Sequence, residues 1–257
     1  MRLASVLTPL DEHNLTLAAQ CGVQDITVRY PGPDLAKLAE LQQQISAHGL
    51  RLAIVEGYLP IEKINLGTDH LGEEMAAMKN LLRNMAKAGI GLLCYNFMSG
   101  TDWVRTRVDA PARGGALTTA FRLADAERAI SLNAVQSAIG RDTITAGALW
   151  ANLERFLREI IPVAEDCGVT MAMHPDDPPL PSFMGKARIM DSVEGFERLV
   201  QLVPSERNAI CFCLGTFATM GVDIPATIRR LGRHIRYVHF RDANGTAEDF
   251  VETFHDN

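Results

Sequence analysis

The chain has 257 residues, 47% of them hydrophobic, which is enough to bury the core of one α/β barrel-sized domain. Its net charge of −6, the lack of a basic patch and an N-terminus unlike a signal peptide or a membrane span argue against nucleic acid and membranes as partners. The five cysteines include no CxxC pair, which argues against a disulfide framework and favours a reducing cytoplasm.

Short apolar runs alternate with helix-like segments along the chain and are typical of buried parallel strands. We predict strands at 2–7, 25–30, 52–58, 91–97, 169–174, 209–214 and 235–240. A glycine precedes several of these runs, where it would end the helix in the left-handed conformation. These glycines are Gly22, Gly49, Gly89 and Gly168, with a looser copy of the phrase at Gly232.

The strict alternation of strands and helices predicts a parallel sheet with right-handed crossovers. No GxGxxG motif follows the first strand, so we favour a TIM (β/α)8-type barrel over a doubly wound sheet. We expect one barrel domain over residues 1–257. We expect its last strand to be missing from this sequence, which stops at Asn257 soon after the seventh strand. Either the chain is truncated, which we favour, or the barrel is left open. The first and seventh strands should therefore flank a gap.

The helix before the fifth strand shows the clearest amphipathic pattern. Six apolar residues fall at the spacing that puts side chains on one helical face. They are Leu153, Phe156, Leu157, Ile160, Ile161 and Ala164. We expect this face to pack against the sheet.

The longest departure from the repeat lies at about 99–145, after the fourth strand. In a barrel such a loop insertion projects from the C-terminal face, over the active site. Arg105 and Arg107 in this insertion are candidates to hold an anionic substrate, the alternative being a solvated loop. Because the loop is polar, we expect Arg105→Ala to change stability little.

Three of the apolar runs end in a potential metal ligand, namely His174, Cys213 and His239. A polar group at a buried strand end needs a partner, and parallel strands bring their carboxyl ends to one face of a barrel. We therefore predict a divalent-metal site there. Each residue alone also fits a hydrogen-bonded core histidine or a small buried cysteine. Cys211 shares the face of Cys213 but lies one layer deeper, and we assign it to the core.

Further polar residues follow the strand ends. Asp176 and Asp177 lie in the segment HPDDPP at 174–179. They could orient an imidazole, bind a sugar hydroxyl or act in acid–base chemistry, the alternative being a turn with a helix-capping Asp. His255 is another candidate for proton transfer, and Glu56 a weaker one. Residues expected to bind the substrate are Tyr95, Asn96, Arg105 and Arg241.

Several of these motifs together resemble the D-mannonate dehydratase family, in the family's order and from about residue 50 to the end. They are YNFM at 95–98, DWVRT at 102–106, HPDDPP at 174–179, CLGT at 213–216 and HFR at 239–241. The resemblance implies a xylose-isomerase-like barrel and a Mn²⁺ (or Fe²⁺) site. Its ligands would be His174, Cys213, His239 and a later Asp, expected beyond Asn257. The implied reaction is loss of water from D-mannonate, or a related aldonate, to give 2-keto-3-deoxy-D-gluconate.

Two other functions remain open on the residues. A metal-dependent sugar isomerase or epimerase on the same barrel would need carboxylate ligands at the strand ends, which Cys213 and the HPDDPP segment disfavour. A non-catalytic sugar-acid-binding protein is the alternative from another class. In each case the expected partner is a small-molecule sugar acid, and assembly into a homo-oligomer is compatible with the sequence.

Overall fold

Seven parallel strands form the large sheet of the computed structural model, which describes residues 1–100, 103–131 and 142–254. Their order in space follows their order in the chain, with a crossover between each pair of neighbours. All seven lie on the predicted apolar runs. They are β1 (Ala4–Val6), β2 (Asp25–Arg29), β3 (Arg51–Glu56), β4 (Leu92–Tyr95), β9 (Thr170–Met173), β12 (Asn208–Cys213) and β13 (Ile235–His239).

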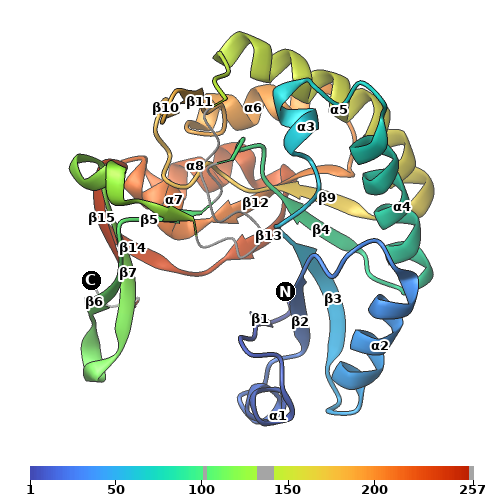
Figure 1. Ribbon diagram of the computed structural model, residues 1–257. Helices are drawn as coiled ribbons and strands as arrows, with labels where there is room; N and C mark the ends of the chain where they lie inside the picture. Colours follow the sequence, from blue (N-terminus) through green and yellow to red (C-terminus); the bar gives the residue numbers. More distant parts are fainter. Residues whose placement is uncertain (101–102, 132–141, 255–257) are drawn as a thin grey trace.

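The large sheet curls like the wall of a barrel, so that its last strand faces its early strands (Figure 1). Two contacts cross the interior. The hydroxyls of Thr27 on β2 and Tyr237 on β13 are 3.1 Å apart. Nε2 of His239, also on β13, donates a hydrogen bond of 2.9 Å to Oε2 of Glu56 on β3. The curl therefore brings residues more than 180 positions apart in the chain into contact.

The first and seventh strands are the two edges of this sheet, as expected. Within the described residues, β1 pairs only with β2 and β13 only with β12. Apolar side chains are exposed along both edges, among them Val6 at 38% and Val238 at 42%. Both edges therefore present unpaired backbone groups beside apolar surface.

Helices connect the strands and cover the convex face of the sheet, with α4 and α5 side by side (Figure 1). Among the described helices, none is long and apolar enough to cross a membrane. They are α1 (Glu12–Gln20), α2 (Leu35–Ser46), α3 (Glu62–Leu66), α4 (Glu73–Lys87), α5 (Ala146–Cys167), α6 (Val193–Leu202), α7 (Leu214–Thr219) and α8 (Ile224–Leu231).

Helix α5 shows how the predicted pattern becomes packing. The whole predicted stripe is buried in the main core between the helices and the sheet: Leu153, Phe156, Leu157, Ile160, Ile161 and Ala164. The helix ends at Gly168, whose φ of +68° is the left-handed conformation expected there. Gly22, Gly49 and Gly89 also have positive φ. Gly232 does not: its φ is −52°, and it begins the 3₁₀ turn η3 (Gly232–His234), so the prediction was wrong at this position.

The region expected as a loop insertion is largely ordered into short strands. It holds β5 (Val104–Arg105), β6 (Arg107–Pro111), β7 (Leu117–Arg122) and β8 (Ile130–Ser131), with the 3₁₀ turns η1 (Arg113–Gly115) and η2 (Leu123–Arg128). Two of these strands join the C-terminal hairpin β14 (Asp242–Thr246) and β15 (Asp249–Thr253) in an antiparallel sheet of order β14-β15-β7-β6. Figure 1 shows this small sheet beside the large one.

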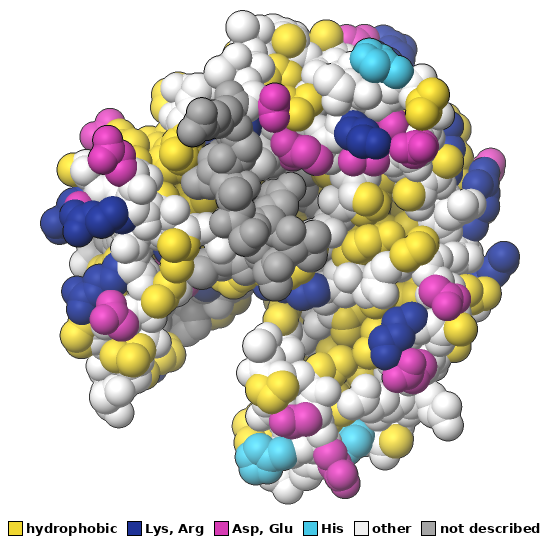
Figure 2. All heavy atoms as spheres, in the orientation of Figure 1, with side chains coloured by type: hydrophobic (Ala, Val, Ile, Leu, Met, Phe, Trp, Pro, Cys, Tyr) yellow, Lys and Arg dark blue, Asp and Glu magenta, His cyan; other side chains and the backbone are white. Residues whose placement is uncertain are grey.

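The small sheet has an apolar core of its own. It consists of Val104, Phe121, Leu180, Phe183 and Phe250. Leu180 and Phe183 come from the segment after β9, which carries the hairpin β10 (Ser182–Phe183) and β11 (Lys186–Ala187). On the face in Figure 2, Lys and Arg side chains are interspersed with Asp and Glu, as the mixed composition predicts.

Four charged residues tie the small sheet to the ends of the large-sheet strands. Arg105 of β5 donates two hydrogen bonds to Asp177, of 2.9 and 3.0 Å, and another to Glu252 of β15. Arg241, just after β13, donates to the same two carboxylates. The side chain of Arg105 is 0% exposed. The expectation that Arg105 lies in a solvated polar loop was therefore wrong.

We predict that Arg105→Ala lowers the free energy of unfolding by about 3–5 kcal/mol, because it leaves the buried carboxylate of Asp177 and the half-buried one of Glu252 short of their counter-charge. Urea denaturation followed by circular dichroism would measure the loss. Arg107→Ala is the matched control, since Arg107 lies on β6, the next strand along the chain, in an exposed pair with Asp109, and its loss should change stability little. Equal effects of the two substitutions would contradict a structural role for Arg105.

Another buried carboxylate lies at the opposite end of the large sheet, where the strands begin. Asp25, at the start of β2, accepts two hydrogen bonds from Arg2 and two from Arg51, all between 2.8 and 3.0 Å. Burial alone would raise the pKa of Asp25, but the hydrogen bonds from Arg2 and Arg51 outweigh it and lower the pKa. The ionised form is therefore favoured by folding.

We predict that Asp25→Asn costs about 1–2 kcal/mol of stability at pH 7. The lowered pKa means that the ionised Asp25 stabilises the fold above the unfolded-state value near 3.9, and that this contribution fades as the pH falls through the folded value. The difference between wild type and variant should therefore shrink between pH 7 and pH 3 in urea titrations. Asp249→Asn, in an exposed pair with Arg122, is the control. A difference that stays constant with pH would count against this assignment.

Candidate functional site

The structure brings the three predicted ligand residues together at the carboxyl ends of adjacent strands. His174 follows β9 directly, Cys213 ends β12 and His239 ends β13. One donor atom of each lies within 4.8 Å of those of the other two. The two imidazole centroids are 4.9 Å apart. We call these three residues the strand-end group.

Hydrogen bonds orient both imidazoles. Nδ1 of His174 lies 2.7 Å from the carbonyl oxygen of Pro175, so Nδ1 is the donor and Nε2 carries the lone pair in the neutral ring. His239 donates from Nε2 to Glu56. Burial lowers the pKa of each histidine, but neighbouring thiols outweigh it and raise both pKa values, Cys213 acting on His174 and Cys211 foremost on His239. An outer partner that holds a ring nitrogen is typical of metal-binding histidines.

The thiol of Cys213 is buried and accepts two hydrogen bonds. The hydroxyl of Thr216 donates at 3.1 Å and Nε of Arg241 at 3.3 Å. Burial would raise the pKa of Cys213, but the charges of Arg241 and His174 lower it well below its usual value. Gly215 allows this approach, because a Cβ there would lie 3.3 Å from Arg241. These contacts favour the thiolate of Cys213, the form that binds metals.

Glu56 is more central than its weak sequence signal suggested. At the end of β3, it accepts hydrogen bonds from His239 and from Arg29. Burial raises the pKa of Glu56, but the hydrogen bond from His239 and the charges of His239 and Arg29 bring it to about 2. The guanidinium of Arg29 lies over the rings of Tyr58 and Trp103, 5.3 Å from each centroid. Glu56 therefore stays ionised at neutral pH and anchors His239.

The two aspartates of the HPDDPP segment have different surroundings. Asp177 accepts from Arg105 and Arg241, whose charges hold its pKa well below its usual range despite burial. Asp176 accepts from the backbone N–H of Met190 at 2.7 Å, and burial raises its pKa to about 6. Its other oxygen, Oδ1, has no hydrogen-bond partner among the described residues. Of the two aspartates, Asp176 has the pKa nearer neutrality, and its side chain is fully buried against the backbone of Met190.

Other predicted residues fall outside the group or outside the described chain. Tyr95 packs in the main core, with its ring 6.0 Å from that of Phe156 on α5, so its side chain lies on the helix side of the sheet and the substrate role expected for it is not supported. Asn96 follows at the strand end, where Oδ1 accepts from the backbone of Met98. His255 lies outside the described residues.

Sequence reasoning missed two residues that the structure places near the group. Glu252 binds both arginines from a hairpin far along the chain, and no local motif marks it. Cys94, on β4, lies close to Cys211 and His239. The sequence places Cys94 one residue before the end of this strand, but no motif around it marks it as a ligand.

Comparison with known proteins identifies the family. The family model of D-mannonate dehydratase (UxuA) matches residues 11–141 and 122–257. The mannonate dehydratase of Streptococcus pneumoniae (strain 70585) is 34% identical over 253 residues, which cover 91% of this chain and 69% of that protein.

Solved structures show the same family and the same fold. The crystal structure of mannonate dehydratase from Streptococcus suis serotype 2 matches with a TM-score of 0.86 and 32% identity, over 98% of this chain and 76% of that one. The D-psicose 3-epimerase of Clostridium cellulolyticum H10, at 15% identity and a TM-score of 0.59, covers 93% of this chain and 72% of its own and shares the fold alone. The fold is therefore the predicted TIM-barrel type, and the chain belongs to the D-mannonate dehydratase family.

Proposed function

We propose that this protein is a hydro-lyase that removes water from D-mannonate to give 2-keto-3-deoxy-D-gluconate, with Mn²⁺ or Fe²⁺ at the strand-end group. The observation that carries the proposal is the convergence of His174, Cys213 and His239 within 4.8 Å at three adjacent strand ends, in a chain of this family.

The donor set suits such a cation. Two imidazoles and one thiolate are ligands that first-row divalent metals accept, and three protein ligands leave positions open for water, substrate or a further protein ligand. The hydrogen bonds to Pro175 and Glu56 hold the two rings in place before a metal binds. When bound, the cation supplies Lewis-acid stabilisation of the negative charge that develops at the substrate's carboxylate.

On the protein side, we assign recognition of the sugar acid to Arg241 and Asn96. Arg241 is 26% exposed and lies against Cys213, so it can reach a substrate carboxylate beside the metal ligands. Both arginines bind Asp177 and Glu252, but the side chain of Arg105 is fully buried and cannot contact a substrate. We therefore propose that Arg105 is a positioning residue that acts through Arg241.

Dehydration requires removal of the C2 hydrogen and protonation of the departing C3 hydroxyl, after which the enol becomes a ketone. Asp176, with a pKa near 6, is our candidate for one proton transfer. Asp177 serves instead as the counter-ion of the two arginines, because it stays ionised. His255 remains our candidate for the other proton transfer. All five cysteines are free, which supports action in the reducing cytoplasm.

We predict that the protein, loaded with Mn²⁺ and given D-mannonate, forms a keto-deoxy acid with loss of one water per turnover. Mass spectrometry and a colorimetric assay for 2-keto-3-deoxy acids would detect it. A product of unchanged mass would indicate an isomerase or epimerase instead. Binding of D-mannonate without any product, in a protein that also binds Mn²⁺, would indicate a sugar-acid-binding protein.

We predict that Cys213→Ala and His174→Ala each weaken Mn²⁺ binding by more than about 100-fold, because each removes a direct ligand. Activity at limiting Mn²⁺ should fall in parallel, and removal of metal with EDTA should abolish it reversibly. Calorimetric titration of Mn²⁺ would give the affinities. Cys167→Ala, at the end of α5, removes a thiol remote from the strand ends and should behave as wild type. Unchanged Mn²⁺ affinity in Cys213→Ala would refute this ligand set.

A further inference from the structure

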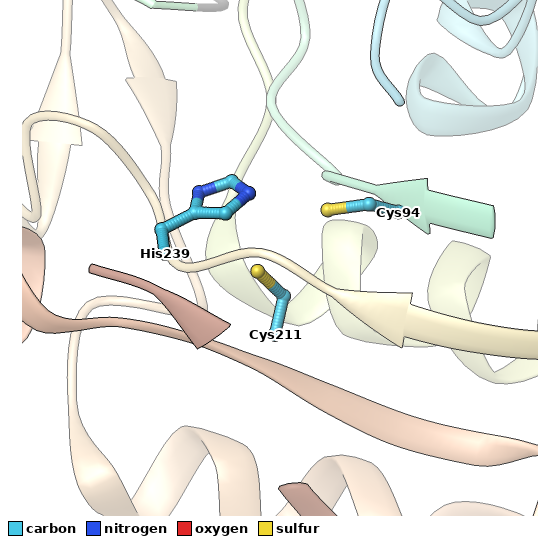
Figure 3. A group of neighbouring side chains, drawn as sticks. All are labelled: Cys94, Cys211 and His239. Carbon is cyan, nitrogen blue, oxygen red and sulfur yellow. The ribbon is translucent and has the colours of Figure 1, made fainter. Parts of the chain in front are cut away.

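A second group of donor atoms lies one layer deeper in the barrel. It consists of Cys94 on β4, Cys211 on β12 and His239 on β13, and one donor atom of each lies within 4.8 Å of the other two. Figure 3 shows both sulfur atoms directed toward the imidazole. The side chains of Cys94 and Cys211 are fully enclosed, at 1% and 0% exposure. We call these three residues the inner group.

The sheet explains why two thiols from different strands meet. Side chains alternate along a strand, so Cys211 points to the same face as Cys213 but one layer lower. Strand β9 runs between β4 and β12 and presents Ala172, which is the register partner of Cys94. Because Ala172 carries only a methyl group, no larger side chain from β9 fills the space between the two sulfurs. Ile54 and Ala172 line the same small cluster.

The separations suit a metal ion better than a disulfide. The two cysteines lie on strands that are not neighbours, so a direct S–S bond would require the backbone to move. A tetrahedral ion with bonds of about 2.3 Å to sulfur holds two thiolates about 3.8 Å apart. All donor pairs here are within 4.8 Å, so binding requires adjustments of about 1 Å at most.

We propose that Cys94, Cys211 and His239 form a second cation site, selective for a thiophilic divalent ion such as Zn²⁺. Two thiolates among apolar neighbours favour soft cations, whereas Mn²⁺ prefers harder ligands. The three protein donors are a Cys₂His set, to which a water adds the fourth tetrahedral position. On binding, the two thiol protons are released to solvent as the metal–sulfur bonds form.

The inner site and the strand-end site compete for His239, an inference that rests on the proposed function of the strand-end group. A neutral imidazole has only one unprotonated nitrogen, so its single lone pair serves one cation at a time. Zn²⁺ in the inner site therefore withdraws a ligand from the Mn²⁺ above it. The result is inhibition by thiophilic cations without any contact between them and the substrate.

Cd²⁺ is the probe for the inner site, because its bonds to thiolate absorb in the ultraviolet in proportion to their number. We expect His174→Ala, which breaks only the strand-end group, to keep a saturable Cd²⁺ signal from two thiolates. In a Cys213→Ala background, which removes the strand-end thiolate, Cys211→Ala should lose about half or more of the signal, since at most one inner thiolate remains. Cys21→Ala in the same background is the matched control: it leaves the same number of thiols, but removes an exposed one.

Activity provides an independent readout. In Mn²⁺-loaded protein, the Zn²⁺ concentration for half inhibition should rise at least about tenfold in Cys211→Ala, with its Mn²⁺-dependent activity retained. Circular dichroism in EDTA checks that the variant is folded, and Cys211→Ser repeats the test if Ala is not tolerated.

A two-thiolate signal that survives when Cys211→Ala is combined with Cys213→Ala, or that disappears in His174→Ala or Cys21→Ala, overturns the inner site. If the Cd²⁺ signals follow the expected pattern but D-mannonate is not dehydrated, the inner site stands and the proposed function fails. If dehydration occurs and Cys211→Ala in the Cys213→Ala background leaves the Cd²⁺ signal unchanged, the proposed function stands and the inner site fails.

Discussion

The hydrogen bond between Glu56 and His239 joins the third strand of the large sheet to its last strand, and much of the chemistry depends on it. It spans the interior of the curled sheet at 2.9 Å, so it can form only when the strands between β3 and β13 are in register. It also orients the imidazole that both donor groups share. Because Glu56 stays ionised, its charge favours an imidazole that donates from Nε2.

A network of four charges has the corresponding role for the small sheet. Arg105 and Arg241 converge on Asp177 and Glu252, and Arg241 reaches further to the thiol of Cys213. Removing one member leaves a buried charge uncompensated, which costs several kcal/mol, whereas the intact network contributes far less to stability than its contacts suggest. The main effect of the network is to position the C-terminal hairpin against the edge of the candidate site.

Two donor groups lie at successive levels of the barrel interior and share His239. Ile54 and Ala172 line a small cluster with the thiols of Cys94 and Cys211, and Ala172 is the register partner of Cys94. The strand ends above carry His174 and the thiol of Cys213. The inner group therefore offers two thiolates and the strand-end group one, and thiolates select softer cations than imidazole does.

The sequence by itself determined the strands, the helices that cover them and the residues that meet at the strand ends. These depend on local patterns: apolar runs, helical spacing such as that of α5, and the rule that parallel strands end on one face. His174, Cys213 and His239 could be found because each ends such a run.

Only the tertiary structure decided which side of β4 faces inward, which placed Cys94 in the barrel and Tyr95 against α5. It also decided that Arg105 is buried against Glu252, 147 residues away, because the pairing of β7 with β15 leaves no local trace in either segment. Burial and charge pairing depend on contacts between distant segments, and a local pattern does not record them.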